Sequence, residues 1–272
     1  FCNYYYNCLR DVDRHMMKLI HSLEDTGQID NTIIFMISDH GEMLGQQGAR
    51  GKIVSWEESI RVPTLVYHPD LKDKKLCNSV ISNIDIVPTL LEFTGLSKSE
   101  LRDKHPELKG NSYAELVENV NYDNVRDKEG HLIHGVQIIP TVFEVAEKFR
   151  HTALADGFLA KTKAFMSEGK FLPDFTPPLN YKGVVDKKHK FLRFFSPRQN
   201  NIPTNYDELT KYNAEYQLYD LENDPFEMND LAKDENNRDL LMSMNDKCNT
   251  LADKEIGLEN HVIHLPGPDW FW

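Results

Sequence analysis

The feature that most constrains this chain is an uninterrupted apolar segment at residues 32–38, TIIFMIS, which runs directly into Asp39 and His40. A β-branched and aromatic run without polar alternation is typical of a strand that is covered on both faces in a parallel sheet. Apolar residues at helical spacing over positions 9–23, followed by Gly27, predict a helix before this strand. A helix, a short turn and a buried strand make half of a βαβ unit, so we expect an α/β core.

Length and composition exclude several classes of protein. A chain of 272 residues suffices for one large α/β domain or for one and a half domains. The net charge of −12 makes nucleic acid an unfavourable partner. The longest apolar run, 33–37, is far shorter than the ~20 residues that cross a bilayer, so we expect no membrane span. The four cysteines include no C-x-x-C pair, which argues against a zinc knuckle or a thioredoxin-like site.

The chain divides by pattern into three segments. Residues 1–145 are expected to belong to the α/β core, residues 146–180 to an excursion or linker, and residues 181–272 to a small α+β subdomain of antiparallel hairpin strands and one helix. The charged stretch 97–130 is expected to be irregular surface. A basic cluster in the hairpin region is expected to be solvated; its members are Lys182, Lys187, Lys188, Lys190 and Arg193.

The polar residues at the end of the first strand are the best candidates for chemistry. Ligand sites in open α/β sheets lie beyond the carboxyl ends of strands, and Asp39 and His40 both carry metal-ligating atoms. The alternative, that Asp39 caps a turn and His40 is a surface histidine, stays open from the pattern alone. Lys52 ends the glycine-rich loop that follows, but the loop is not a phosphate-binding P-loop, because Gln46 and Ile53 occupy positions that need Gly and Ser or Thr.

Several motifs in the same order resemble a known family. The segments S-D-H-G-E-M-L-G-Q-Q-G (38–48), G-K (51–52) and E-E-S-I-R-V-P (57–63) look like the second half of a sulfatase of the arylsulfatase and choline-sulfatase kind, in the alkaline-phosphatase superfamily. Three later segments agree with the same family, at 85–91, 183–191 and 218–232. The resemblance implies part of an alkaline-phosphatase-like core, a mostly parallel sheet between helices, with a small C-terminal α+β subdomain.

The resemblance also implies roles for single residues. Asp39 and His40 would be ligands of a divalent metal ion, and Lys52 would contact the sulfate group as a catalytic residue. Calcium is the first expectation, but many sulfatases have Asn where this chain has His40, which leaves manganese or another softer ion open. The implied activity is hydrolysis of a sulfuric ester carried by a small molecule or a saccharide.

Other family features are missing from the sequence. The family's nucleophile is a formylglycine made within a C/S-x-P-x-R motif, and no such motif occurs here. We therefore expect the chain to be the C-terminal portion of a sulfatase, completed by an N-terminal half and inactive alone. Family members are periplasmic, secreted or lysosomal, which leaves the compartment unknown. Two alternatives stay open: a phosphodiester or phosphonate monoester hydrolase of the same superfamily, and a truncated domain without catalytic activity.

Overall fold

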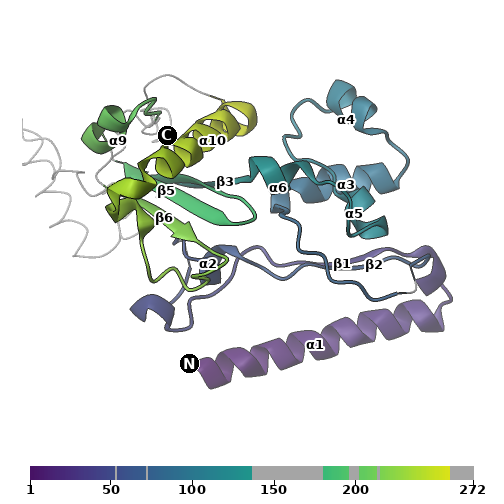
Figure 1. Ribbon diagram of the computed structural model, residues 1–272. Coiled ribbons are helices and arrows are strands. Elements are labelled where there is room, and N and C mark those ends of the chain that lie inside the picture. Colours follow the sequence, from purple (N-terminus) through teal and green to yellow (C-terminus); the bar gives the residue numbers. More distant parts are fainter. Residues whose placement is uncertain (53, 72, 137–179, 196–201, 213–214, 258–272) are drawn as a thin grey trace, which may run out of the picture. The chain divides into compact units, whose positions relative to one another are not determined.

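The computed structural model describes most of the chain as helices, strands and turns (Figure 1). The described residues are 1–52, 54–71, 73–136, 180–195, 202–212 and 215–257. The chain forms two compact units: unit 1 consists of residues 1–131 and 225–227, and unit 2 of residues 132–224 and 228–272. The segment boundaries expected from the sequence stay predictions, and the expected linker lies outside the described residues except for Asn180. No described helix is both long enough and apolar enough to cross a membrane.

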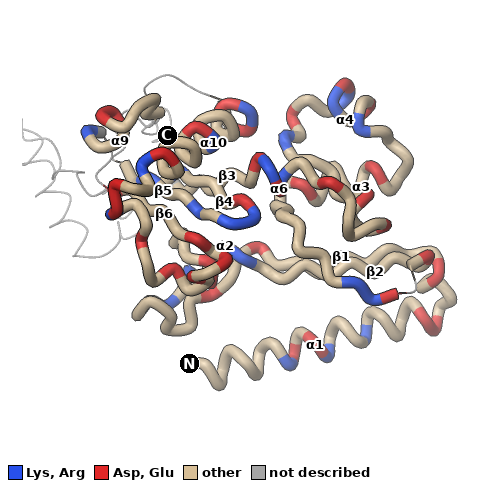
Figure 2. Tube along the Cα trace, in the orientation of Figure 1, with Lys and Arg blue, Asp and Glu red and all other residues tan. Residues whose placement is uncertain are grey.

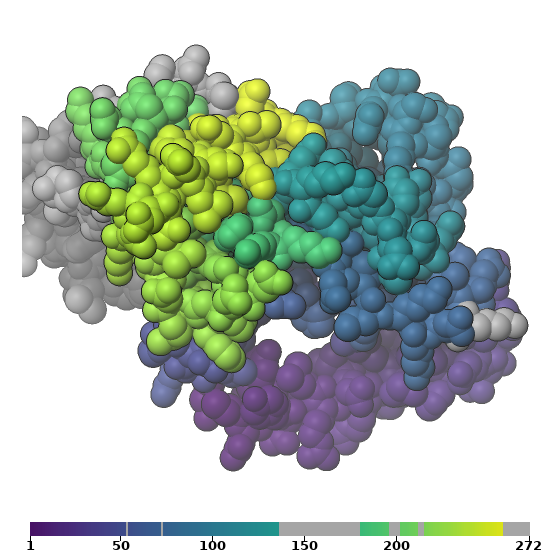
Figure 3. Space-filling view, viewed as in Figure 1, coloured from purple at the N-terminus to yellow at the C-terminus, as the bar shows by residue number. Residues whose placement is uncertain are grey.

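Unit 1 begins with the long helix α1 (Cys2–Asp25) that the sequence predicts. The helix ends where Gly27, with a φ of 66°, donates its amide to the carbonyl of Glu24. None of its residues is buried, although Met16, Ile20 and Leu23 are half-buried along one stripe. In the space-filling view its atoms, shown in purple, lie at the surface along the visible length of the helix (Figure 3).

The first strand is shorter and less buried than its composition predicts. Strand β1 (Ile34–Met36) pairs antiparallel with β2 (Leu65–Tyr67), with Phe35 opposite Val66. All three residues of β1 are half-buried. Within the described residues the strand has this one antiparallel partner, and parallel neighbours that would cover both of its faces are not among them. The apolar composition specifies an extended strand, whereas the number and direction of its neighbours depend on contacts that composition does not encode.

The segment expected to be irregular surface is instead helical and partly buried. It contains α4 (Lys98–Lys104), α5 (Ala114–Glu118) and α6 (Val125–Glu129), which follow α3 (Ile86–Phe93). Arg126 of α6 is 1% exposed and donates from Nε and Nη2 to the two carboxylate oxygens of Asp85, at 2.5 and 2.6 Å. The ring of Phe93 lies 6.2 Å from that of Phe35, so α3 packs on the strand pair. These contacts join positions far apart in sequence, which local periodicity does not report.

Unit 2 is a four-stranded sheet with a helix packed against it. The sheet order is β3 (His131–Val136), β4 (Asn180–Val185), β5 (His189–Phe195) and β6 (Glu215–Asp220). The predicted hairpin is confirmed as β4–β5, and β5 also pairs antiparallel with β6. Helix α10 (Arg238–Ile256) contacts β4 and β5, while the short helix α9 (Tyr206–Tyr212) contributes Leu209 to the core. The buried core consists of Val184, Phe191, Leu209, Leu218, Leu241, Met244, Cys248 and Leu251.

The basic cluster of the hairpin divides into an exposed tip and a buried base. Lys187 and Lys188 are exposed at the tip, which is blue in Figure 2. Lys182, Lys190 and Arg193, in contrast, are no more than 7% exposed, so the expectation that the whole cluster is solvated is wrong. Side chains alternate between the two faces of a strand, and the face that carries Val184 and Phe191 into the core carries Lys182 and Arg193 with them. Arg193 donates from Nη1 to Asn245 Oδ1 of α10 at 2.6 Å.

Candidate active site

Asp39 and His40 follow β1 directly, and their side chains converge. The carboxylate oxygen Asp39 Oδ2 lies 3.2 Å from His40 Nε2, and the His40 amide donates to Asp39 Oδ1 at 3.0 Å. The Asp39 side chain is 82% exposed and that of His40 is 37% exposed. The structure thus brings the two candidate side chains together.

Hydrogen bonding defines the tautomer of His40. Its Nδ1 lies 2.8 Å from the carbonyl oxygen of Gly41, which can only accept, so Nδ1 carries the proton. Lys52 Nζ lies 2.6 Å from His40 Nε2, and an ammonium group can only donate, so Nε2 is the acceptor. The Nε2 lone pair therefore faces the ammonium group of Lys52. The Asp39 carboxylate oxygen Oδ2 lies 3.2 Å from the same nitrogen.

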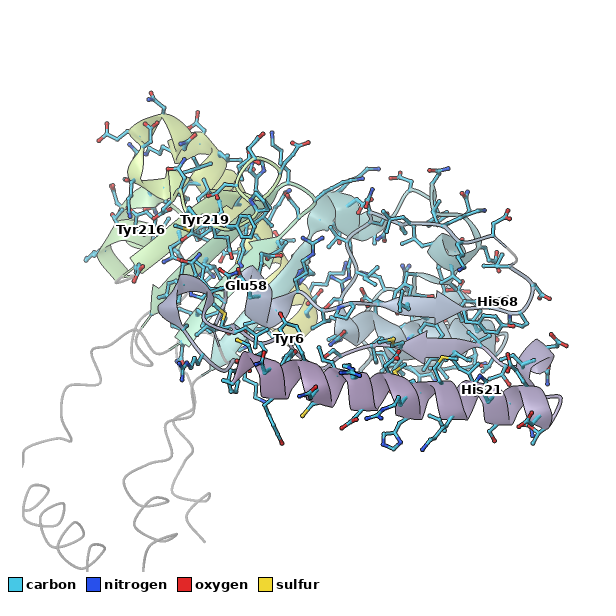
Figure 4. All side chains as sticks on the ribbon, turned by 90° about the horizontal axis from the view of Figure 1, so that it is seen from below. Tyr6, His21, Glu58, His68, Tyr216 and Tyr219 are labelled. Atoms are coloured by element: carbon cyan, nitrogen blue, oxygen red, sulfur yellow. The ribbon has the colours of Figure 1, made fainter. Side chains whose placement is uncertain are left out.

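Gly41 follows Asp39 and His40 and lies directly against α2 (Glu57–Ile60). The Gly41 amide donates to the carbonyl of Ser59 at 2.7 Å. A Cβ atom at position 41 would lie 2.0 Å from the backbone oxygen of Glu58, which Figure 4 labels on this helix. No side chain fits such an approach, so the site requires glycine after His40.

A closed loop returns Lys52 to His40. The Glu42 carboxylate accepts the Gly51 amide at 2.7 Å, and the buried Met43 donates its amide to the Gly51 carbonyl at 2.9 Å. The chain between them turns through the short 3₁₀ helix η2 (Gln46–Gly48). Because both bonds hold Gly51, the adjacent Lys52 has a defined place beside the histidine although its side chain is exposed.

The polar surroundings favour the charged form of Asp39. Desolvation acts to raise the pKa of this carboxyl, but the hydrogen bond from the His40 amide and the nearby His40 and Lys52 side chains outweigh it, and the net pKa is below the usual value. Asn83 supports the strand end by donating from Nδ2 to the carbonyl of Ser38 at 3.0 Å. The site thus brings together an ionised carboxylate, an imidazole ring and an ammonium group.

Two of these groups suit a divalent cation. Carboxylate oxygen and neutral imidazole nitrogen are both established ligand types, and their separation lets one ion contact both. Within the described part of the chain, no cluster of three or more His, Cys, Asp or Glu residues is arranged to hold a metal. Asp39 and His40 therefore fit a metal site as two of its ligands and do not complete one.

Comparison with known proteins relates the first part of the chain to a family. The sequence model of the sulfatase family matches residues 1–96, which include Asp39, His40 and Lys52. An arylsulfatase of Clostridium perfringens is 33% identical over 121 residues, a match that covers 43% of this chain and 24% of the arylsulfatase. Residues 1–96 thus match the sulfatase family. The resemblance of its motifs to that family is thereby confirmed.

Solved structures show that the chain shares its fold with known enzymes. A structure in complex with its substrate D-glucosamine-2-N,6-O-disulfate matches with a TM-score of 0.60 at 20% identity, covering 92% of this chain and 40% of the other. A phosphonate monoester hydrolase of Agrobacterium radiobacter matches with a TM-score of 0.59 at 21% identity, covering 90% and 40%. The expected alkaline-phosphatase-like α/β fold class is confirmed. The chain spans less than half the length of these relatives.

Contacts from distant segments were not predicted from the sequence. The carboxylate of Glu227 accepts the Glu57 amide at the start of α2, at 2.8 Å, across 170 positions. Glu227 is 4% exposed. Its segment, 218–232, did stand out by family resemblance, but nothing in its local pattern points to the loop that carries Lys52.

Proposed function

We propose that these residues form one side of the active site of a metal-dependent sulfuric ester hydrolase. The observation that carries this proposal is the convergence of Asp39 Oδ2, His40 Nε2 and Lys52 Nζ, with 3.2 Å between the first two atoms and 2.6 Å between the last two. The match of residues 1–96 to the sulfatase family supports the class of reaction. The enzymatic activity and its substrate are our proposal, because the chain spans only part of its relatives.

Asp39 and His40 would hold a divalent cation, with calcium as the first candidate and manganese or another ion as alternatives. A bound cation supplies positive charge that stabilises negatively charged oxygen atoms at the reacting centre. The ammonium group of Lys52 and a metal ion cannot use the same Nε2 lone pair. Cation binding would therefore release Lys52 from His40 and leave its ammonium group free to contact the sulfate oxygens.

Lys52 would act on the substrate by charge. A sulfate ester carries a negative charge, and a preorganised ammonium group stabilises further charge that develops as the ester bond breaks. The hydrogen bonds of Glu42 and Met43 to Gly51 keep the lysine backbone fixed, so little reorganisation is needed at the moment of reaction. A saccharide sulfate is one candidate substrate, because a related fold binds a glucosamine disulfate.

The nucleophile would come from outside these residues. We propose a formylglycine, together with the remaining metal ligands, from a part of the protein that precedes this segment, because the 272 residues contain no C/S-x-P-x-R motif. Residues 1–272 alone are then expected to hydrolyse no sulfate ester. Phosphonate monoester hydrolysis is a second candidate activity, supported by the shared fold of the Agrobacterium enzyme.

The test compares Lys52→Ala with the wild type in the complete protein, with an aryl sulfate ester and a phosphonate monoester as substrates. Loss of one preorganised charge donor typically lowers turnover by about 10²–10³. We expect that loss with the sulfate ester, and none in Lys18→Ala, which changes an exposed lysine of α1. Near-normal turnover by Lys52→Ala would contradict the role of Lys52. Faster hydrolysis of the phosphonate by the wild type would favour the second activity, and turnover of neither ester would favour a non-catalytic domain.

A further inference from the structure

A three-residue segment from the C-terminal part of the sequence belongs to the unit that carries the candidate site. Residues 225–227 group with unit 1, whereas the residues on either side of them group with unit 2. The segment contacts the loop region around Lys52 twice. Gln47 donates from Nε2 to the Phe226 carbonyl at 2.8 Å, and the Glu57 amide donates to Glu227 Oε2 at 2.8 Å.

The backbone at these contacts adopts a conformation that non-glycine residues avoid. Among the described residues, the non-glycine positions with positive φ are Leu44, Gln47 and Glu227, with values of 50°, 52° and 55°. Two of these three take part in the contacts just described. Glu227 is also buried, so its carboxylate loses hydration as well as backbone freedom. Such costs persist where the surrounding structure holds a residue in place, and they cluster at functional sites.

A short series of contacts leads from Glu227 to His40. Glu57, whose amide Glu227 accepts, is the first residue of α2. Within α2, the Ser59 carbonyl accepts the Gly41 amide, and the Glu58 carbonyl lies so close that no Cβ fits at Gly41. The Gly41 carbonyl in turn accepts Nδ1–H of His40. These contacts connect the start of α2 with the Nδ1 side of the His40 ring.

We propose that Glu227 is a positioning residue for the Asp39–His40 pair and acts through α2. The carboxylate fixes the start of α2, α2 fixes Gly41, and Gly41 holds the imidazole ring. This inference deepens the proposed function and rests on it for the role of the pair as cation ligands. The link from Glu227 to Gly41 rests on the contacts alone.

The experiment compares Glu227→Ala, Glu227→Gln and the control Glu222→Ala in the complete protein. Glu222 lies five positions before Glu227 in the sequence, but it is exposed and pairs with Lys188 at 3.8 Å. The first measurement is hydrogen exchange of the Gly41 amide. We expect exchange to accelerate by roughly tenfold in Glu227→Ala, with β5 amides of unit 2 unchanged. Glu227→Gln should restore slow exchange, because its side-chain carbonyl still accepts the Glu57 amide.

The second measurement is the affinity for Mn²⁺, used alone as the probe. Removing groups that orient metal ligands typically lowers metal affinity by about 10–100-fold, and we expect a loss of that order in Glu227→Ala with rescue in Glu227→Gln. Exchange at Gly41 that equals the control would overturn the proposal, as would faster exchange spread evenly over both units. Unchanged Mn²⁺ affinity in Glu227→Ala would also overturn it. If the wild type binds no Mn²⁺ while Gly41 still responds, the link to Gly41 stands and the proposed cation site fails.

Discussion

The two strand pairs of this chain differ sharply in how completely they are covered. Every residue of β4 in unit 2 is buried, whereas no residue of β1 or β2 in unit 1 is. The hairpin of unit 2 packs on α10, whose buried residues recur at helical spacing, while α1 of unit 1 has no buried residue. Unit 2 thus has a closed core of its own. The polar site of unit 1 depends instead on a loop held by hydrogen bonds.

This comparison predicts unequal responses to the same substitution. Leu218 in β6 is 0% exposed and Leu65 in β2 is 61% exposed. We expect Leu218→Ala to lower the free energy of unfolding by about 2–5 kcal/mol, because it leaves a cavity in a packed core. Leu65→Ala should change it by no more than about 0.5 kcal/mol. Urea unfolding of both variants, with hydrogen exchange measured separately in each unit, gives the two changes in free energy of unfolding. Equal losses of free energy would show that the two strand pairs are equally covered.

A smaller effect concerns Lys182, one of the basic residues buried in unit 2. Desolvation, followed by the charge of Arg193, lowers the pKa of Lys182 to about 8 from 10.5, although the Cys248 thiol acts in the opposite direction. The folded pKa lies below the unfolded one, so the unfolded state binds the proton more tightly. Unit 2 should therefore gain stability as the pH rises from about 8 towards 10.5.

The variant Lys182→Met removes this dependence. Burial raises the pKa of Cys248, which lowers stability at high pH, so the quantity to measure is the difference in unfolding free energy between wild type and Lys182→Met across this pH range. As the pH rises, the unfolding free energy of the wild type should increase relative to that of Lys182→Met. A difference independent of pH would mean that Lys182 titrates normally and is not held in an apolar environment.

Local pattern predicted much of the fold, and its failures have a common cause. The β4–β5 hairpin, β6 and α10 follow from alternation and helical spacing, because neighbours in sequence form these elements. The pairing of Asp85 with Arg126 joins positions 41 apart, and the contact of Glu227 with Glu57 joins positions 170 apart. No periodicity encodes such partners. Arg193 was expected to be exposed to solvent because it is charged. It lies two residues after Phe191 in β5, however, so its side chain is on the same buried face of the sheet.

The candidate site shows the same division. The end of an apolar strand predicted Asp39 and His40, and the glycine-rich loop drew attention to Lys52. Their roles as metal ligands and as a sulfate contact stay predictions. The tautomer of His40, the bonds that return Gly51 to Glu42 and Met43, and the approach of Gly41 to α2 required coordinates, since each depends on how the loop closes.

The most direct test of the account is the metal content of Asp39→Ala, measured together with sulfate-ester turnover in the complete protein. Asp70→Ala is a matched control, because Asp70 also lies beside a histidine, with Oδ2 4.0 Å from His68 Nδ1, and its side chain is 89% exposed. We predict that Asp39→Ala loses bound divalent cation and activity together, while Asp70→Ala keeps both. Full metal content in purified Asp39→Ala would contradict the proposal that Asp39 and His40 hold the cation.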